Sequence, residues 1–144
     1  MSAHLLIELC GLSHREAAEF LGVRLDTVKS WFRSRPNTAR PGVLDELKAL
    51  HATQRRAAAT QIRLMRSLAR QHGEPEAVEL ALSSDDHEAR SKGWPCVGAE
   101  RMTYALVAAR LDCRVVLVPR GSTPASAAAA DAHDRRRPSK GKSP

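Results

Sequence analysis

The spacing of small and apolar residues in "AEFLGVRLDTVKSW", residues 18–31, constrains the fold more than any other feature of the sequence. Two short helices that cross at a steep angle need a small residue where they touch, and Ala18 provides it. They also need a turn residue that adopts the left-handed conformation without strain, and Gly22 follows four positions later. Val28 and Trp31 are three residues apart, so they lie on one face of the second helix. The stretch predicts a tight pair of helices.

The residues around this stretch predict further helices. Residues 2–10 form an apolar first helix, and Ser13 with Glu16 three positions later makes a capping box for the next one. The third helix is expected over residues 25–34, because the position before Pro36 disfavours helical geometry.

A long helical segment follows, from Pro41 to about His72, where Gly73 and Pro75 end it. Apolar residues recur at helical spacing near both of its ends, but the stretch "HATQRRAAATQ" between them has only alanines and polar groups. The pattern predicts one long helix with a solvated middle, or two helices with a soft joint. A coiled coil is disfavoured, because a sustained heptad of apolar residues is missing.

The second half of the chain predicts a small strand–helix–strand unit. Residues 77–84 alternate as a half-buried strand does, residues 84–98 are typical of a loop, residues 99–111 are helical, and residues 113–121 are the best strand. Two short strands and one helix bury too little surface to be stable alone, so we expect a second copy of the chain to cover them. After Gly121 the sequence is low in complexity and is expected to be disordered.

The charge is distributed unevenly along the chain. Residues 1–72 have twelve Lys and Arg against six Asp and Glu, residues 73–120 have six against eight, and residues 121–144 have five against two. The net charge of +7 and the pI near 10 favour a polyanionic partner. A basic front and an acidic middle are typical of a nucleic-acid-binding part joined to a protein-binding part.

Several classes of protein are disfavoured. No apolar run approaches the roughly 18 residues that cross a bilayer, and no secretory signal is recognisable, so no membrane partner is expected. Cys10, Cys96 and Cys113 are odd in number, widely spaced and without a CxxC pair. This usage indicates a reducing compartment and argues against disulfides and zinc fingers. The chain is expected to be cytoplasmic.

No pattern of catalytic residues is recognisable in the sequence. The histidines have no metal-ligand spacing with the cysteines, and there is no phosphate-binding glycine loop or nucleophile elbow. The densest polar cluster, "SSDDHE" at residues 83–88, is better explained as a solvated turn after a strand than as a metal site or a proton shuttle. We therefore expect no enzymatic activity, no metal and no cofactor.

The register of Ala18, Gly22, Val28 and Trp31 is that of a helix-turn-helix. With its flanking helices it resembles, over residues 2–50, the DNA-binding domain of phage-repressor type. The resemblance implies that the second helix of the motif enters the major groove and that its outward side chains contact bases. Arg and Lys can donate to guanine, Asp can accept from cytosine, and the Thr methyl can contact thymine. The residues at these positions are Arg24, Asp26, Thr27, Lys29, Ser30 and Arg33.

Asp26 has two explanations, because a carboxylate that faces DNA repels phosphate. It either selects a base or caps its helix together with Thr27, and capping is the preferred explanation.

Phosphate contacts are expected from the start of the first motif helix, whose N-terminal amides can bind an anion, and from the basic loop after the motif. A solvated surface charge is the alternative for each arginine of that loop. The expected phosphate contacts are Ser13, His14, Arg15, Arg35, Asn37, Thr38 and Arg40.

The order of a helix-turn-helix, a long basic helix and a strand–helix–strand unit is similar to that of anti-CRISPR-associated repressors and related phage regulators. The stretch "GWPCVGAERMTYALVAARL" at residues 93–111 is similar in outline to the loop and small-residue helix of one branch of that group. The resemblance implies a dimerisation domain, repression of the protein's own operon through an inverted repeat, and RNA as a further partner. The basic tail is an addition to that pattern.

A homodimer is also expected because one head contacts only about four or five base pairs, whereas two heads read two half-sites about one turn apart. Trp94 is explained equally well as an intersubunit anchor or as part of the core. The expected interface consists of Val78, Leu80, Leu82, Trp94, Met102, Leu106, Val115, Val116, Leu117 and Val118.

The sequence thus predicts a mainly α protein with a small α/β C-terminal part. The expected domains are a helix-turn-helix DNA-binding domain (1–40), a connecting helix or helix pair (41–73), a strand–helix–strand dimerisation domain (74–120) and a disordered basic tail (121–144). The expected function is that of a homodimeric repressor that binds double-stranded DNA at an inverted repeat in its own promoter, an anti-CRISPR operon where the second resemblance holds. The alternatives are the DNA-recognition subunit of a phage packaging or recombination complex, and the antitoxin of a toxin–antitoxin pair.

Overall fold

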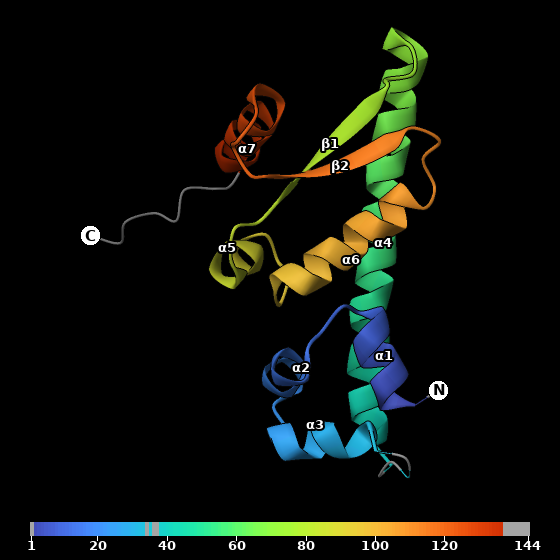
Figure 1. Cartoon of the computed structure of the whole chain (residues 1–144), viewed down its shortest axis with the longest axis vertical. Coiled ribbons are helices and arrows are strands. Elements are labelled where there is room, and N and C mark those ends of the chain that lie inside the picture. The colour runs from blue at the N-terminus through green and yellow to red at the C-terminus, as the bar shows by residue number, and fades with distance from the viewer. Residues whose placement is uncertain (1, 34, 36–37, 137–144) are drawn as a thin grey trace, which may run out of the picture.

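The computed structural model describes residues 2–33, 35 and 38–136. A 32-residue helix, α4 (Pro41–His72), runs along the molecule, with a helical head at one end and an α/β body at the other (Figure 1). The head contains α1 (Ala3–Leu9), α2 (His14–Leu21) and α3 (Leu25–Trp31). The body contains β1 (Ala77–Leu82), α5 (Asp86–Ser91), α6 (Val97–Ala108), β2 (Arg114–Pro119) and α7 (Pro124–Arg136).

The core of the head consists of side chains that the predicted register turns inward. Val28 is fully buried and Trp31 is 4 % exposed, while Leu47 of α4 closes the head from the side. Cys96 and Ala99 from the body belong to the same apolar cluster. The head and the body therefore share one continuous core.

The long helix is uninterrupted, so the prediction of one helix is confirmed and that of a jointed pair is wrong. Pro41 occupies its first turn, where the missing N–H is no loss, and Gly73 ends it. Its polar middle is not solvated throughout, because Gln54 is completely buried. The Gln54 Nε2 donates to the carbonyl oxygens of Cys10 (2.9 Å) and Ala99 (3.1 Å). One amide thus connects the long helix to both the head and the body.

The two strands form a parallel sheet in which Val78 lies beside Val115 and Leu80 beside Leu117. The longer of the two helices between them, α6, packs on α4 and on β1. A second apolar cluster forms where these elements meet, and it contains Leu80. The predicted strand–helix–strand order is confirmed, with α5 as an additional helix. Helices of the same chain, α6 and α7, pack on β1.

One segment predicted to be a loop is partly helical. Residues 84–98 contain α5, which begins after Asp85. The Glu88 N–H donates to Asp85 Oδ1 (2.8 Å), and the Ser84 N–H donates to Glu88 Oε2 (2.7 Å). The acidic stretch is therefore a helix cap and not a solvated turn. Two helix boundaries also differ from prediction: α3 ends at Trp31, and α6 spans Val97–Ala108.

The predicted disorder after Gly121 is wrong for α7. Alanine favours helix, and Thr123 starts it by accepting from the Ser126 N–H (3.2 Å). The Thr123 hydroxyl also donates to Glu79 Oε2 of β1 (2.7 Å), which holds α7 beside the sheet. The rest of the expected tail, residues 137–144, lies outside the described residues. Within the described ranges, no helix is both long enough and apolar enough to cross a membrane.

Candidate nucleic-acid interface

The turn between α2 and α3 has the geometry that the sequence predicts. Gly22 has a φ of +64°, in the left-handed region, and the Val23 N–H donates to the Ala18 carbonyl oxygen (3.1 Å). At the start of α2, Ser13 Oγ accepts from the Glu16 N–H (3.2 Å), and Glu16 Oε2 accepts from the Ser13 N–H (2.7 Å). The predicted glycine turn and capping box are both confirmed.

Exposed cations lie on α3 and directly before and after it. Asp26, Lys29 and Arg33 are separated by three and four residues, so their exposed side chains lie on one face of the helix and its continuation. Arg24 and Thr27 are exposed at the beginning of the same helix. In the part of the chain that the structure describes, no ion pair neutralises Arg24, Lys29 or Arg33. These cations can therefore bond an external anion or a guanine edge without breaking a contact.

A groove of about 930 Å³ runs between α3 and the beginning of α4. The long helix begins at the end of the molecule where α3 lies (Figure 1), so the positive end of its dipole is at that end too. Charged and hydroxyl residues that line the groove are Arg24, Asp26, Thr27, Ser30, Arg33, Thr38, Arg40 and Glu46.

The residues predicted to contact phosphate differ in how accessible they are. The Ser13 hydroxyl is exposed but already caps α2. His14 is half-buried, and its ring packs on Phe32 with the centroids 4.2 Å apart. Asn37 lies outside the described residues. The remaining four are exposed: Arg15, Arg35, Thr38 and Arg40.

Two predictions for α3 are wrong. Ser30 is only 6 % exposed, and its Oγ donates to the Thr27 carbonyl oxygen (2.6 Å), so the side chain is not presented to bases. Asp26 does not cap the helix, since the N-cap residue is Arg24 and no side chain caps this end. Asp26 is instead exposed in the first turn, where its carboxylate interacts favourably with the positive end of the helix dipole.

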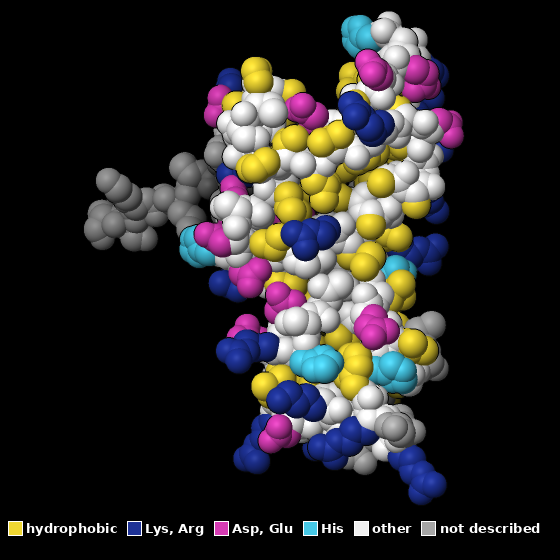
Figure 2. Space-filling view, in the orientation of Figure 1, with side chains coloured by type: hydrophobic (Ala, Val, Ile, Leu, Met, Phe, Trp, Pro, Cys, Tyr) yellow, Lys and Arg dark blue, Asp and Glu magenta, His cyan; other side chains and the backbone are white. Residues whose placement is uncertain are grey.

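The residues predicted for a dimer interface are divided between core and surface. Leu80 is 4 % exposed and clusters with Ile62 and Val107, so it belongs to the core of one chain and its assignment to an interface is wrong. Leu117 is 41 % exposed, and Trp94 is half-buried. Figure 2 shows apolar side chains gathered in the hollow between α7 and the end of α4. The other predicted residues are half-buried: Val78, Leu82, Met102, Leu106, Val115, Val116 and Val118.

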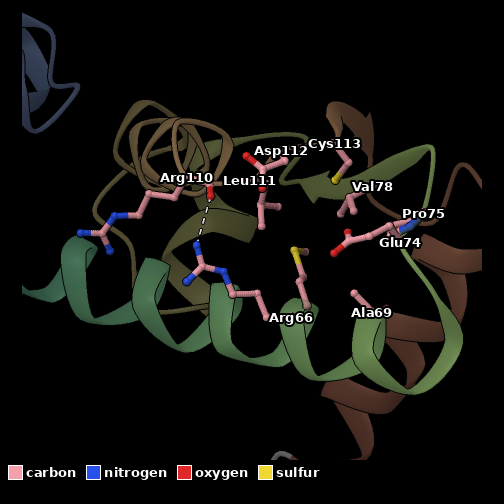
Figure 3. A pocket seen from close by; sticks show the side chains of 10 residues that line it. Arg66, Ala69, Glu74, Pro75, Val78, Arg110, Leu111, Asp112 and Cys113 are labelled. Atoms are coloured by element: carbon pink, nitrogen blue, oxygen red, sulfur yellow. Dashed lines mark hydrogen bonds between the residues drawn. The ribbon is translucent and has the colours of Figure 1, made fainter.

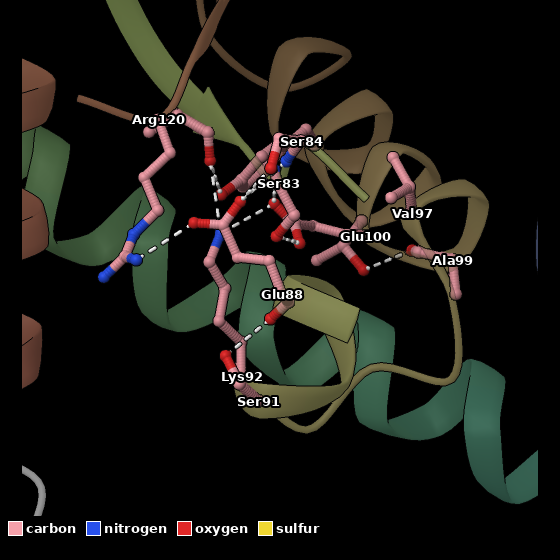
Figure 4. Close-up of polar contacts among 12 residues, drawn as sticks. Ser83, Ser84, Glu88, Ser91, Lys92, Val97, Ala99, Glu100 and Arg120 are labelled. Atoms are coloured by element: carbon pink, nitrogen blue, oxygen red, sulfur yellow. Dashed lines mark hydrogen bonds and ion pairs between the residues drawn. The ribbon is translucent and has the colours of Figure 1, made fainter. Parts of the chain in front are cut away.

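A buried polar cluster that the sequence reasoning missed lies at the carboxyl ends of the two strands (Figure 4). Glu100 of α6 accepts from the Ser83 hydroxyl (2.6 Å), the Ser83 N–H (3.0 Å) and Lys92 Nζ (2.9 Å). Tyr104, one turn later, donates to the Ala81 carbonyl oxygen (2.8 Å). Burial, and then the charge of Glu100, raise the pKa of Tyr104 above its ordinary value. A carboxylate on the inward face of an otherwise apolar helix was the signal available in the sequence.

A second carboxylate extends this cluster to the end of β2. Glu88 Oε1 accepts from Arg120 Nη1 (2.9 Å), and Glu88 Oε2 accepts from the hydroxyl of Ser84 (2.9 Å). The backbone N–H of Ser84, followed by the bonds from Arg120 and the Ser84 hydroxyl, holds the pKa of Glu88 below its usual range. These bonds connect α5 to both strand ends, which indicates a structural role.

The remaining candidates for chemistry are weak. The cavity between the end of α4 and the loop before β2 has a volume of about 50 Å³ (Figure 3), well below the roughly 300 Å³ of small ligand pockets. Burial raises the pKa of the Cys10 and Cys96 thiols to about 11, so neither is a thiolate at neutral pH. Among the described residues, no three His, Cys, Asp or Glu side chains gather as a metal site requires.

No protein-family model matches the chain, and no curated protein matches it in sequence. The function of the chain is therefore inferred from the geometry of α2, α3 and their surroundings.

Proposed function

We propose that the chain is a sequence-specific DNA-binding transcriptional regulator, a homodimeric repressor that acts on an inverted repeat in its own promoter. The observation that carries this proposal is the exposed row of Asp26 and Lys29 on α3 and Arg33 just after it, with α3 fixed against α2 by the Gly22 turn. Lys29 and Arg33 can donate to guanine O6 and N7, and Asp26 can accept from cytosine N4. This combination can contact both guanine and cytosine in a major groove.

Phosphate contacts would hold α3 in register. Arg24 and Arg40 line the groove beside α3, and Arg15 is exposed on α2. Such contacts fix the orientation of the protein on the duplex without reading sequence, and they weaken as salt rises.

A dimer supports specificity, because α3 has only seven residues and reads a short half-site. We place the dimer contact on the body, where Leu117 is exposed on the edge strand β2 and apolar side chains gather in the hollow beside α7 (Figure 2). RNA as a further ligand and an anti-CRISPR operon as the target are predictions of the resemblance alone.

The experiment is a gel shift with DNA from directly upstream of the protein's own gene, against scrambled competitor. Tight, competitor-resistant binding to an inverted repeat by two protomers is the expected result. Weak binding that competitor removes would contradict base reading and leave a basic module with general DNA affinity. A larger ring on the DNA would favour the packaging subunit, and binding that requires a partner toxin would favour the antitoxin.

A further inference from the structure

A second row of cations lies on α4, away from the helix-turn-helix. Arg56, Arg63 and Arg70 are seven residues apart, which is close to two helical turns, so they form one stripe with about 10 Å between neighbours. All three side chains are exposed, and we call them the arginine ridge. A hydroxyl residue precedes each of them by three positions: Thr53, Thr60 and Ser67.

Two of these hydroxyls bond the guanidinium groups of the ridge. Arg56 Nη2 donates to Thr53 Oγ1 (3.1 Å), and Arg63 Nη2 donates to Thr60 Oγ1 (3.3 Å). The threonine hydroxyls in turn donate to carbonyl oxygens one turn earlier, at 3.1 Å in both cases. A guanidinium has five N–H donors, so each of these bonds restricts a long side chain and leaves other donors for a ligand. The repeated unit makes an ordered row of donors.

The ridge faces away from the rest of the molecule. Gln54, Ala58 and Ile62 are the buried residues of this part of α4, and the ridge lies on the other side of the helix. Figure 2 shows Lys and Arg side chains projecting along the edge of the molecule that α4 forms. The ridge is therefore open to a large partner.

The charge of this segment is not compensated. Residues 47–73 contain no Asp or Glu, and within the described ranges no ion pair involves α4. Glu–Lys pairs four residues apart stabilise a solvated helix, whereas like charges at that spacing, such as Arg66 and Arg70, destabilise it. This arrangement of like charges destabilises the isolated helix. A face that is only solvated would not require so many unpaired cations. The cations are Lys48, Arg55, Arg56, Arg63, Arg66 and Arg70.

We propose that the arginine ridge binds the phosphate backbone of a second DNA duplex, separate from the one that contacts α3. Regularly spaced cations over roughly 20 Å of a straight helix match a rigid polyanion, and neutralising its phosphates releases counterions. The helix has no Phe, Tyr or Trp side chain on which unpaired bases could stack, which favours a duplex over a single strand.

A duplex that crosses the end of the molecule at α3 would leave the ridge free. The long helix runs away from α3 (Figure 1), and Arg70 lies about 44 Å along it from Pro41. Duplex DNA stays nearly straight over such distances, because its persistence length is about 150 base pairs. The protein would therefore bridge two duplexes. This inference extends the proposed function to a second surface, and binding at the ridge does not depend on what α3 reads.

The test uses the full chain carrying Arg56→Gln, Arg63→Gln and Arg70→Gln together, since glutamine keeps helix propensity and removes the charged guanidinium groups. The matched control carries Arg90→Gln, Arg101→Gln and Arg114→Gln, three exposed positions outside α4, so both variants lose the same charge. Each protein is bound to an immobilised short duplex of random sequence. Capture of a second, fluorescent duplex is then measured over a range of salt concentrations.

We expect the wild type and the control to capture the second duplex and the ridge variant to capture it about tenfold less, with the slope of log affinity against log salt reduced by about 3. Equal capture by the ridge variant and the control would overturn the proposal. Stronger capture of duplex RNA or of anionic phospholipid vesicles than of DNA would overturn the assignment to DNA.

Two further measurements separate this result from a folding defect and from the function of α3. The melting temperature of the ridge variant should equal or exceed that of the wild type, because repulsion is removed. A lower value would indicate that the ridge is structural. A Lys29→Ala, Arg33→Ala variant should lose binding to the promoter but keep the ridge-dependent capture, so the two proposals fail independently.

Discussion

Gly11 in the head and Gly98 in the body approach each other so closely that neither position has room for a side chain. A Cβ built on Gly11 would lie 2.5 Å from the Gly98 carbonyl oxygen, and a Cβ on Gly98 would overlap the Gly11 carbonyl oxygen. Beside this contact, Gln54 donates to the carbonyl oxygens of Cys10 and Ala99. The head is thus held against α6 by backbone contact.

Gly98→Ala tests this junction, because helix propensity predicts a gain in unfolding free energy whereas steric overlap predicts a loss. Gly98 lies in the first turn of α6, where alanine would ordinarily stabilise by about 1 kcal/mol. The added methyl group instead meets a backbone oxygen, so we expect a loss of about 1–3 kcal/mol in urea unfolding. Gly42→Ala is the control, since Gly42 is also in a first helical turn and has open space around it. Similar shifts for both variants would disprove the tight junction.

Gln54→Leu should destabilise the protein, because it removes the donor to two buried carbonyl groups at nearly constant volume. The expected loss is about 1–3 kcal/mol of unfolding free energy. Gln61→Leu is the matched control, seven residues along the same helix at a half-buried position, and its effect should stay within about 0.5 kcal/mol. Chemical denaturation of the two variants side by side measures the difference. Equal effects would mean that the Gln54 bonds add nothing to stability.

The features that could be predicted from the sequence are those that depend on contacts between neighbouring residues. The helix-turn-helix register needs only contacts between residues close in sequence, so Ala18, Gly22, Val28 and Trp31 were sufficient to place it. The exposure of Lys29 and Arg33 followed from the same helical spacing. Ser30 was misplaced because helical spacing puts it beside the outward residues, whereas its side chain is only 6 % exposed and its hydroxyl bonds the Thr27 carbonyl oxygen.

The features that were missed depend on contacts between distant segments. Gln54 appears in the sequence as one more polar residue of a solvated stretch, and only its two carbonyl partners make it a core residue. Glu100 is 17 residues from Ser83, and nothing local pairs them. The alanine-rich tail was predicted to be disordered because it has no large apolar side chain, but α7 docks through Thr123 and Glu79 instead.

Glu88 should make stability depend on acidity. Its folded-state pKa is below the ordinary 4.5, so its contribution is fully present well above pH 4.5 and is lost as the pH falls through that value and below it. The difference in unfolding free energy between the wild type and Glu88→Gln should therefore shrink between about pH 6 and pH 3. Urea unfolding at a series of pH values measures it. A difference that stays constant over this range would rule out the contribution of the Glu88 carboxylate.

Truncation after Gly121 should leave the fold intact but less stable, because it removes α7 and its bond to Glu79. Losing this bond and the burial of small side chains beside β1 predicts a cost of about 1–2 kcal/mol. Truncation after Arg136 is the control and should have almost no effect on unfolding. An unchanged melting temperature in the shorter protein would show that α7 does not stabilise the sheet.

Lys29→Ala and Arg33→Ala should each weaken binding to the cognate promoter site by about 1–3 kcal/mol, and binding to random DNA far less. The reason is that Lys29 is exposed on α3, Arg33 is exposed just after it, and neither has an ion pair within the described part of the chain. Ser30→Ala is the informative control, because Ser30 lies in the same helix but its hydroxyl bonds the Thr27 carbonyl oxygen. Its promoter affinity should stay close to that of the wild type.

Competition gel shifts with cognate and random duplexes measure all three variants. Equal losses on both DNAs for Lys29→Ala and Arg33→Ala would reduce these residues to phosphate contacts, and a specific loss for Ser30→Ala would mean that α3 turns in its complex with DNA.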